Sequence, residues 1–436
     1  MISAAVHPER APHDRKRNFK AALVLACVAL PAFAIDVRYL LSVRTDVRTR
    51  TPLPGDAPAS VVGDFELLPR AELTLGERTQ FALQYAPSLL LRDAYSSGRP
   101  LALHRGRLAL SNRWQRATLL LSQDGAYGDA DVGALRPAEE GQPTSVPGVQ
   151  TVGVVKYLRS ATLLSLEARP TDRFTLGMTG GFSVTGSTEQ PAPGQRALLP
   201  LQYGPSGSVR ARLGITRTDG LTTTAQVTAA RFVTGQEQFV AQVLESWDRQ
   251  VSRTLVLTVG AGAAITRERV VASPDFAAII PGEYVEFLPV GQASLTWREE
   301  LAGRPLRLDT SLRVAPFADR FTGLVYERVE ARALSEWRFA REWIATASVG
   351  GAVAVPVGLS LVRPPPMDGT SAASAQDGDR LLFSEGTVTW TAQPWLLLQA
   401  SARVLWTQQP RTGVPGLVQA AGTVSVTVRD QDSLAW

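Results

Sequence analysis

The sequence predicts an all-β protein that crosses a membrane as a transmembrane antiparallel up-and-down β-barrel. Three observations support this prediction. Apolar and polar residues alternate along nearly the whole chain, short turns alternate with longer loops, and no apolar run beyond residue 34 is long enough for a membrane-spanning helix. We expect about 18 strands, with roughly 16 to 20 acceptable, preceded by a signal peptide.

Residues 1–34 have the three parts of a secretory signal peptide. Basic residues up to Lys20 precede an apolar segment at 21–30, and Ala32 and Ala34 provide the small residues of a cleavage site. The apolar segment is shorter than the roughly 20 residues that a membrane-spanning helix needs. We therefore expect two parts, a signal peptide at 1–34 and an outer-membrane type of barrel at 35–436.

Composition limits what the exported part can be. The chain has 45 Lys+Arg and 40 Asp+Glu; the first 34 residues hold five basic and two acidic residues, which leaves 40 and 38. A nearly neutral chain gives little support to nucleic-acid binding, which needs a clustered basic face. Cys27 is the only cysteine and lies in the expected signal peptide, so the exported part has no disulfide.

The alternation has the period of two that places successive side chains on opposite faces of a strand. In residues 174–185 one face carries Phe174, Leu176, Met178, Phe182 and Val184, and the other carries Thr175, Thr179, Ser183 and Thr185. Segments 64–75, 305–314 and 395–406 show the same pattern. No helical pattern of comparable quality occurs, so the sequence predicts strands from end to end.

Turns and loops alternate in the manner of bacterial barrels, whose periplasmic turns are short and whose outer loops are longer. Short turns are expected at 76–78, 170–172, 218–220, 247–249, 339–341 and 392–394, and longer Gly/Pro/Ser-rich loops at 49–60, 93–101, 127–149, 187–202, 268–283, 358–379 and 408–415. Brief links at 234–236 and 316–320 occupy outer positions. With 36–48 as the first strand, the number of strands is even and both termini are periplasmic.

Tryptophan gives an independent indication of the membrane boundaries, because its amphipathic ring concentrates at bilayer interfaces. Eight of the nine tryptophans lie near expected inner turns or at the C-terminus, and the ninth, Trp406, lies at an outer end. Trp395 alone falls outside the apolar parity. The expected interface girdle consists of Trp114, Trp247, Trp297, Trp337, Trp343, Trp390, Trp406 and Trp436.

The final strand resembles that of Gram-negative outer-membrane β-barrel proteins. Val424, Val426, Val428, Leu434 and Trp436 share one parity, as in the C-terminal assembly signal of these proteins. The resemblance covers residues 35–436. It implies an integral outer-membrane location, contact with outer-membrane lipid and recognition by the barrel-insertion machinery.

The polar parity would line the lumen, and it is rich in arginine. The expected lumen-lining residues are Arg44, Arg70, Arg105, Arg107, Arg159, Arg210, Arg212, Arg307, Arg313, Arg328, Glu330, Arg332 and Arg403. One interpretation is that these charges pair with acidic residues across strands and stiffen the wall. The other is that unpaired arginines attract anionic solutes, because charge in a low-dielectric channel concentrates counter-ions.

Function follows from the width of such a barrel, which leaves an aqueous channel unless something fills it. No N-terminal plug domain precedes the first loop, and the best candidates for a constricting loop, 127–149 and 358–379, are modest in length. We therefore favour a channel for export of a hydrophilic polymer such as polysaccharide, with a periplasmic export complex as partner, similar to polysaccharide-secretion barrels. The alternatives are a passive porin-like channel for small hydrophilic or anionic solutes and a structural or adhesive barrel.

No pattern indicates an enzyme, so we expect no catalytic, cofactor-binding or metal-binding residues. His104 is the only histidine beyond residue 34, and its parity matches Leu108 and Leu110, which favours an interface side chain over a general base. The acidic segments at 124–133 and 376–380 offer oxygen ligands for weak calcium binding, but their Asp/Gly pairs are more typical of turns. The exported part has no cysteine, one histidine and scattered carboxylates, so it lacks the ligand spacing of a zinc site.

Overall fold

The computed structural model describes most of the expected barrel. It covers residues 35–50, 60–75, 78–92, 101–131, 154–189, 199–271, 281–319, 324–357, 379–409 and 414–429. Within these ranges no helix is long and apolar enough to cross a membrane. The expected signal peptide at 1–34 and Trp436 lie outside the described residues.

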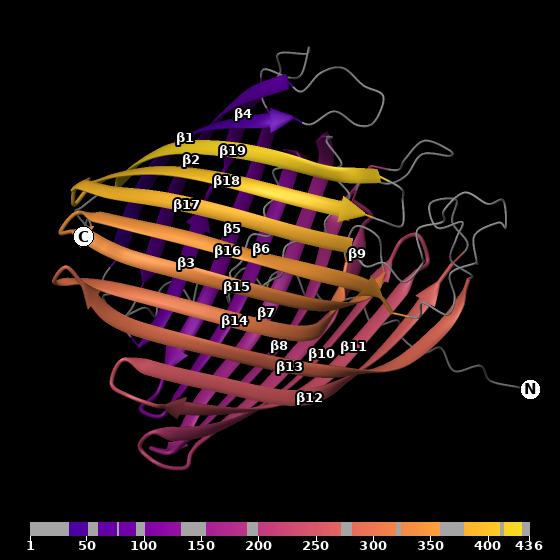
Figure 1. The fold of residues 1–436 in the computed structure, drawn as a ribbon. Helices are drawn as coiled ribbons and strands as arrows, with labels where there is room; N and C mark the ends of the chain where they lie inside the picture. Colours follow the sequence, from indigo (N-terminus) through magenta and orange to yellow (C-terminus); the bar gives the residue numbers. More distant parts are fainter. Residues whose placement is uncertain are drawn as a thin grey trace, which may run out of the picture.

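Strands make up nearly all of the described chain (Figure 1). They are β1 (Ile35–Arg50), β2 (Ser60–Leu75), β3 (Thr79–Tyr85), β4 (Ser88–Arg92), β5 (Leu101–Arg113), β6 (Ala117–Asp131), β7 (Val154–Thr171), β8 (Phe174–Ser187), β9 (Gln202–Gly214), β10 (Asp219–Phe232), β11 (Glu237–Gln250), β12 (Leu255–Val270), β13 (Gly282–Leu301), β14 (Arg304–Ala318), β15 (Val325–Ala340), β16 (Trp343–Pro356), β17 (Asp379–Gln393), β18 (Leu396–Gln409) and β19 (Val414–Arg429).

All of these strands belong to one antiparallel sheet in which neighbours in sequence are neighbours in space. β1 pairs with β2 along its whole length and also with β19, from Leu40↔Arg429 to Arg48↔Ala421. The first and last strands are therefore adjacent, and Figure 1 shows indigo β1 beside yellow β19. The predicted class, an all-β antiparallel up-and-down sheet, is confirmed.

β3 and β4 form a broken strand that the sequence analysis did not predict. Both segments pair with β2 on one side and β5 on the other. The break falls at Ala86 and Pro87, where the N–H of Ala86 still donates to the carbonyl oxygen of Arg105 at 2.9 Å. Proline has no N–H to continue the ladder, so the pairing stops there.

The turns and loops alternate as predicted, but several of the predicted boundaries were wrong. The link expected at 316–320 starts only after Ala318, because residues 316–318 still pair with β15. The turn expected at 247–249 lies at 251–254, because β11 continues to pair with β12 through Gln250↔Val256. Ser252 closes that turn by accepting a hydrogen bond from the N–H of Leu255 at 3.1 Å. The loop expected from residue 127 starts after Asp131, because this end of β6 pairs with the start of β7.

The register divides the sheet into two faces, because residues directly opposite each other in an antiparallel pair point the same way. We call one of them the arginine face. It contains Arg107, its directly opposite partners Gln84 and Asp124, and every residue that the register places on the same side of the sheet. The other, the aliphatic face, contains the row Leu110–Leu121–Leu164.

Burial distinguishes the two faces. On β12 the arginine-face residues Ala264, Thr266, Glu268 and Val270 are 1 to 4% exposed, whereas the alternate residues are partly or fully exposed. Within the described strands, the large exposed apolar side chains other than Val256 lie on the aliphatic face, with Leu110, Leu121 and Leu164 at 41, 40 and 50% exposed. The aliphatic face is thus the outside of the barrel, since only a bilayer makes such a continuous apolar surface favourable.

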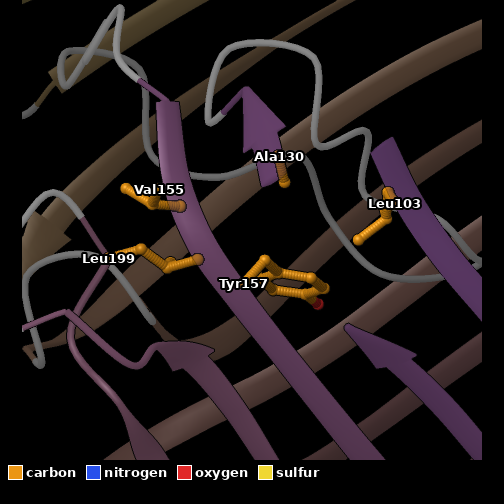
Figure 2. Packing of buried hydrophobic residues seen from close by; sticks show 5 residues of the cluster. All are labelled: Leu103, Ala130, Val155, Tyr157 and Leu199. Atoms are coloured by element: carbon orange, nitrogen blue, oxygen red, sulfur yellow. The ribbon is translucent and has the colours of Figure 1, made fainter. Parts of the chain in front are cut away.

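Apolar residues are buried on the arginine face at the ends of the strands nearest the longer loops. Figure 2 shows one such cluster, in which Leu199, from the β8–β9 connection, accompanies Leu103, Ala130, Val155 and Tyr157. A second cluster holds Leu324, from the β14–β15 connection, with Val270, Tyr326 and Ala354. Parts of two outer connections therefore pack against the inner wall.

A glycine in β6 permits the close approach of β5 beside the cluster of Figure 2. Gly128 has a φ of 143°, and a Cβ built on it would lie 2.1 Å from the carbonyl oxygen of Ala102. No other residue fits both the backbone conformation and this contact.

Replacing Gly128 with alanine should therefore destabilise the barrel by at least about 1 to 3 kcal/mol, the cost of such backbone strain. The measurement is urea unfolding of protein reconstituted in lipid vesicles, followed by tryptophan fluorescence. Gly180→Ala in β8 is the matched control, because a Cβ there meets no atom within 4 Å. Equal stability of the two variants would contradict the assigned role of Gly128.

Candidate channel lumen

The register places every predicted lumen residue on the arginine face. Those with an acidic residue directly opposite include Arg44 (Glu66), Arg107 (Asp124), Arg307 (Glu336), Arg313 (Glu330) and Arg403 (Glu385). Arg70, Arg105, Arg159, Arg210, Arg212, Arg328 and Arg332 have uncharged residues directly opposite, and Glu330 lies opposite Arg313. The alternation in the sequence was sufficient to group these residues, although their role in the lumen stays a prediction.

Several of these arginines form ion pairs within the wall. The closest N···O distances are 3.5 Å for Arg107–Asp124, 3.7 Å for Arg212–Asp248, 2.8 Å for Arg307–Asp309 and 3.2 Å for Arg328–Glu330. Thr258 and Thr296 donate hydrogen bonds of 2.8 and 2.7 Å to Asp248 and Asp309. The arginine face therefore compensates much of its own charge, and cross-strand pairing stiffens it.

Arg328 belongs to the packed wall rather than to open solvent. Its side chain is 4% exposed, and its guanidinium carbon lies 5.5 Å from the centre of the Phe317 ring. A buried guanidinium needs an anionic partner, and Glu330 provides it. Arg328 thus holds the β14–β15 end of the wall together, and sequence phase alone could not distinguish it from an exposed arginine.

Arg210 and Arg332 have a different environment. Arg210 lies opposite Gly177 and Thr224, and Arg332 lies opposite Ser311 and Gly350. No ion pair involving either arginine occurs within the described chain segments. These two side chains therefore provide positive charge that the adjacent strands do not compensate.

An uncharged polar row crosses five strands on the same face. In register it consists of Ser165, Thr179, Ser208, Gln226 and Gln242. The hydroxyls of Thr179 and Ser208 lie 2.7 Å apart, and Gln242 donates to Gln226 at 3.0 Å. Such side chains exchange hydrogen bonds readily, so they offer weak and reversible contacts to a polar solute.

The tryptophans that the structure describes within strands lie on the aliphatic face, and their place at the membrane interface stays a prediction. Trp343 stacks on Trp390 with centroids 5.2 Å apart, and Phe339 lies 5.5 Å from Trp337 and 5.9 Å from Trp343. Their expected distance from the turns was wrong in part. Trp247, Trp297 and Trp337 lie three or four residues inside the ends of their strands, because those strands continue to pair beyond the expected turns.

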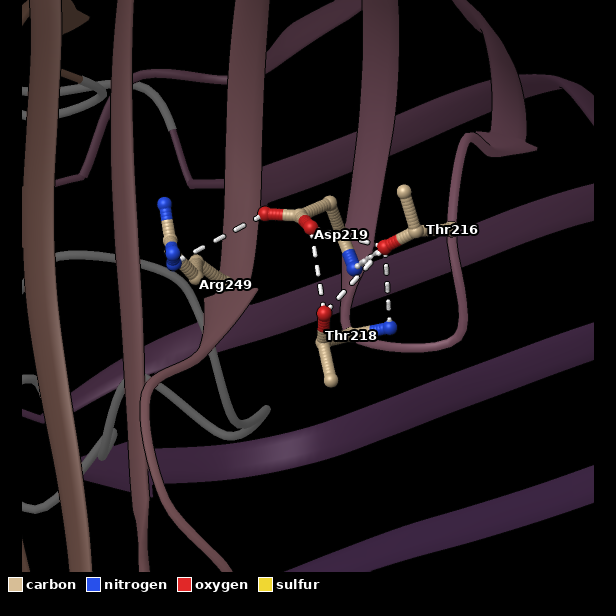
Figure 3. A network of polar contacts seen from close by, with 4 residues as sticks. All are labelled: Thr216, Thr218, Asp219 and Arg249. Atoms are coloured by element: carbon tan, nitrogen blue, oxygen red, sulfur yellow. Dashed lines mark hydrogen bonds and ion pairs between the residues drawn. The ribbon is translucent and has the colours of Figure 1, made fainter.

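The β9–β10 turn is held by a compact polar network (Figure 3). The hydroxyls of Thr216 and Thr218 donate to one carboxylate oxygen of Asp219 at 2.7 and 3.1 Å, and the N–H of Asp219 donates back to Thr216 Oγ1 at 2.9 Å. The other oxygen lies 3.9 Å from Nε of Arg249 in the next strand. This network ties the β9–β10 turn and the start of β10 to β11.

His104 lies on the aliphatic face, where Nδ1 is 2.7 Å from the hydroxyl of Tyr85. A surface hollow of about 500 Å³ also opens on that face, where Ala293, Ala331 and Ala333 leave space between larger neighbours. Within the described segments, no group of three or more His, Cys, Asp or Glu residues is arranged to hold a metal ion.

The model of the EpsX exopolysaccharide export family matches residues 30–434, whereas no curated protein matches the chain. Among solved structures, Acinetobacter baumannii OccAB1 is 11% identical, with 90% of this chain and 96% of that chain covered and a TM-score of 0.48.

Two Pseudomonas aeruginosa structures are similar to a comparable degree. OccK2 (OpdF) is 11% identical over 92% of this chain and 99% of its own, with a TM-score of 0.44. OccK9 (OpdG) is 12% identical over 91% and 99%, with a TM-score of 0.46.

Charge compensation in the wall predicts opposite effects of two neutralising substitutions. Asp248→Asn should raise the ratio of chloride to potassium permeability, because it leaves Arg212 uncompensated. Arg210→Gln should lower this ratio, because it removes a positive charge. Each shift should stay below about tenfold, because salt screens charges over roughly 8 to 10 Å. Reversal potentials of single channels across a KCl gradient measure both. Shifts in the same direction would contradict the assignment of these residues to the lumen.

Proposed function

The chain belongs to the EpsX exopolysaccharide export family, and we propose that it forms the channel through which a polysaccharide or similar hydrophilic polymer crosses the outer membrane. The observation that carries this proposal is the extent of the family match, which covers residues 30–434 and thus nearly the whole barrel. The protein is an integral outer-membrane β-barrel channel protein.

The proposed mature protein is a closed barrel of 18 positions starting at residue 35. Nineteen strand segments are described, and β3 with β4 fills a single position because both pair with β2 and β5. Pairing of β1 with β19 supports closure, which lipid demands because no water is present to satisfy an open edge. The signal peptide at 1–34 would direct export, and the C-terminal strand would direct insertion.

The lumen chemistry suits a polymer that must keep moving. Compensated arginines and the row from Ser165 to Gln242 offer many weak contacts in place of a few strong ones. Transport requires binding strong enough for entry but weak enough for release. Sugar hydroxyls can exchange partners along such a wall without being held at one point.

We propose a periplasmic export complex as the partner that delivers the polymer and restricts access from below. The chain itself then needs only a wall and a lumen, and no residue on it is assigned a catalytic role. An export family match is compatible with such a complex.

The second candidate is a porin-like channel for small anionic solutes. Arg210 and Arg332 favour it, because neither faces an acidic residue on an adjacent strand. Unpaired positive charge in a channel raises the local concentration of anions.

A deletion strain distinguishes the two candidates. Export predicts that cell-surface polysaccharide falls to background while polymer accumulates in the periplasm, and that the wild-type chain restores secretion. Quantification of surface and periplasmic polysaccharide is the measurement, with growth on small organic anions measured in parallel. Normal secretion with impaired anion uptake would overturn export in favour of the porin.

A further inference from the structure

A row of charged residues crosses the outside of the barrel near the ends of β10 to β13. In register it consists of Arg231, Glu237, Arg269 and Glu283, and Arg267 lies one step along β12 on the same aliphatic face. We call these five residues the headgroup row. Because it lies on the outside, it cannot contribute to the lumen.

The headgroup row contains two ion pairs and one remaining cation. Arg231 pairs with Glu237 at 2.8 Å, and Arg267 pairs with Glu283 at 2.7 Å. Arg269 lies directly between the two glutamates, but no hydrogen bond or ion pair engages its guanidinium within the described residues. Three arginines against two glutamates give the row a net positive charge centred on Arg269.

The surface next to the headgroup row changes abruptly from charged to apolar. Val285 and Phe287, the next aliphatic-face residues of β13, are 52 and 78% exposed. Charged side chains followed immediately by exposed apolar ones form an amphiphilic boundary. A lipid matches such a boundary, with its headgroup at the charges and its acyl chains beside the apolar residues.

The distance along β11 places this boundary at the outer leaflet. Trp247, which lies on the same face, is ten positions further along β11 than Glu237. At about 3.3 Å per residue and a strand tilt near 40°, these positions span roughly 25 Å across the membrane, which is the height of the apolar band of such barrels. Between them lie Phe239, Ala241 and Val243, and Glu245 adjoins Trp247 at the inner edge.

We propose that the headgroup row binds a phosphate-bearing lipid of the outer leaflet, with Arg269 as the phosphate ligand. Guanidinium groups bind phosphate through two parallel N–H···O bonds, and Arg269 has its donors available for this. Arg231 and Arg267 are held by their glutamates at the two sides of the phosphate. Basic clusters at membrane surfaces bind anionic headgroups in this way.

The test uses the full-length mature protein in detergent with three probes: bisphosphorylated lipid A, the same lipid without its phosphates, and inorganic phosphate. Bound lipid is measured by native mass spectrometry, and protection against thermal unfolding by tryptophan fluorescence. We expect lipid A to bind and protect, and the other two probes to have little effect. Equal binding of dephosphorylated lipid, or equal protection by inorganic phosphate, would overturn the proposal.

Substitutions at Arg269 locate the site. Arg269→Glu should weaken lipid A binding by about tenfold or more, the loss of a charged hydrogen bond. Arg269→Gln should weaken lipid A binding without adding a negative charge. Arg269→Lys keeps the positive charge and should retain part of the binding. Arg380→Glu is the matched control, since Arg380 is exposed on the same face at the loop end of β17 but has only Val353 and Gln408 opposite.

The proposal fails if Arg269→Gln binds lipid A as tightly as the wild type, or if Arg380→Glu weakens binding as much as Arg269→Glu. Single-channel conductance in KCl provides the folding control, because the headgroup row lies outside the lumen and its variants should conduct normally.

Discussion

The whole structure depends on the requirement that a sheet in lipid satisfies all of its backbone hydrogen bonds within itself. Antiparallel pairing from β1 round to β19 meets this requirement, and it fixes the direction of every side chain at the same time. A shift by one residue in any strand would move its arginines into lipid and its leucines into water. The alternation in the sequence and the register in the structure are therefore consequences of one constraint.

The same constraint explains why the inner wall compensates its charge. Side chains directly opposite each other in an antiparallel pair are about 4.5 to 5.5 Å apart at Cβ, within reach of an ion pair. Arg107 and Asp124 meet in this way, and Arg212 reaches Asp248 two strands away across Gly220, which has no side chain to block the contact. The lumen combines such pairs with the uncharged row that includes Thr179 and Ser208 and with the unpaired Arg210. This combination suits a mobile polar polymer better than a tightly held ion.

Much of the fold could be predicted because its signal is local. Residues 174–185 alternate without interruption, so their two faces could be assigned before any pairing was known. The position of the turn after Trp247 could not be predicted, because aspartate is a common turn residue. The pairing of Asp248 with Thr258 depends on another strand. The break at Pro87 and the packing of Leu199 also depend on contacts distant in sequence.

The lumen prediction shows the same division. Phase alone grouped Arg328 with Arg332, yet one is buried against Phe317 and the other is not, because burial depends on β14, β16 and the connection through Leu324. The headgroup row was missed because its residues lie on four strands, and only the register brings Arg269 between Glu237 and Glu283. Sequence periodicity gives the face of a residue, and pairing gives its neighbours.

The opposite orientation of adjacent residues is tested most directly by fluorescent labels on single cysteines at Leu164 and Ser165 in reconstituted protein. Cys27 lies in the proposed signal peptide, so the mature chain offers a cysteine-free background. We predict that a lipid-phase quencher affects only the label at residue 164 and that an aqueous quencher, added to the lumen side, affects only the label at residue 165. Equal quenching of both labels by the aqueous quencher would contradict a lipid-facing outer wall and a wet interior.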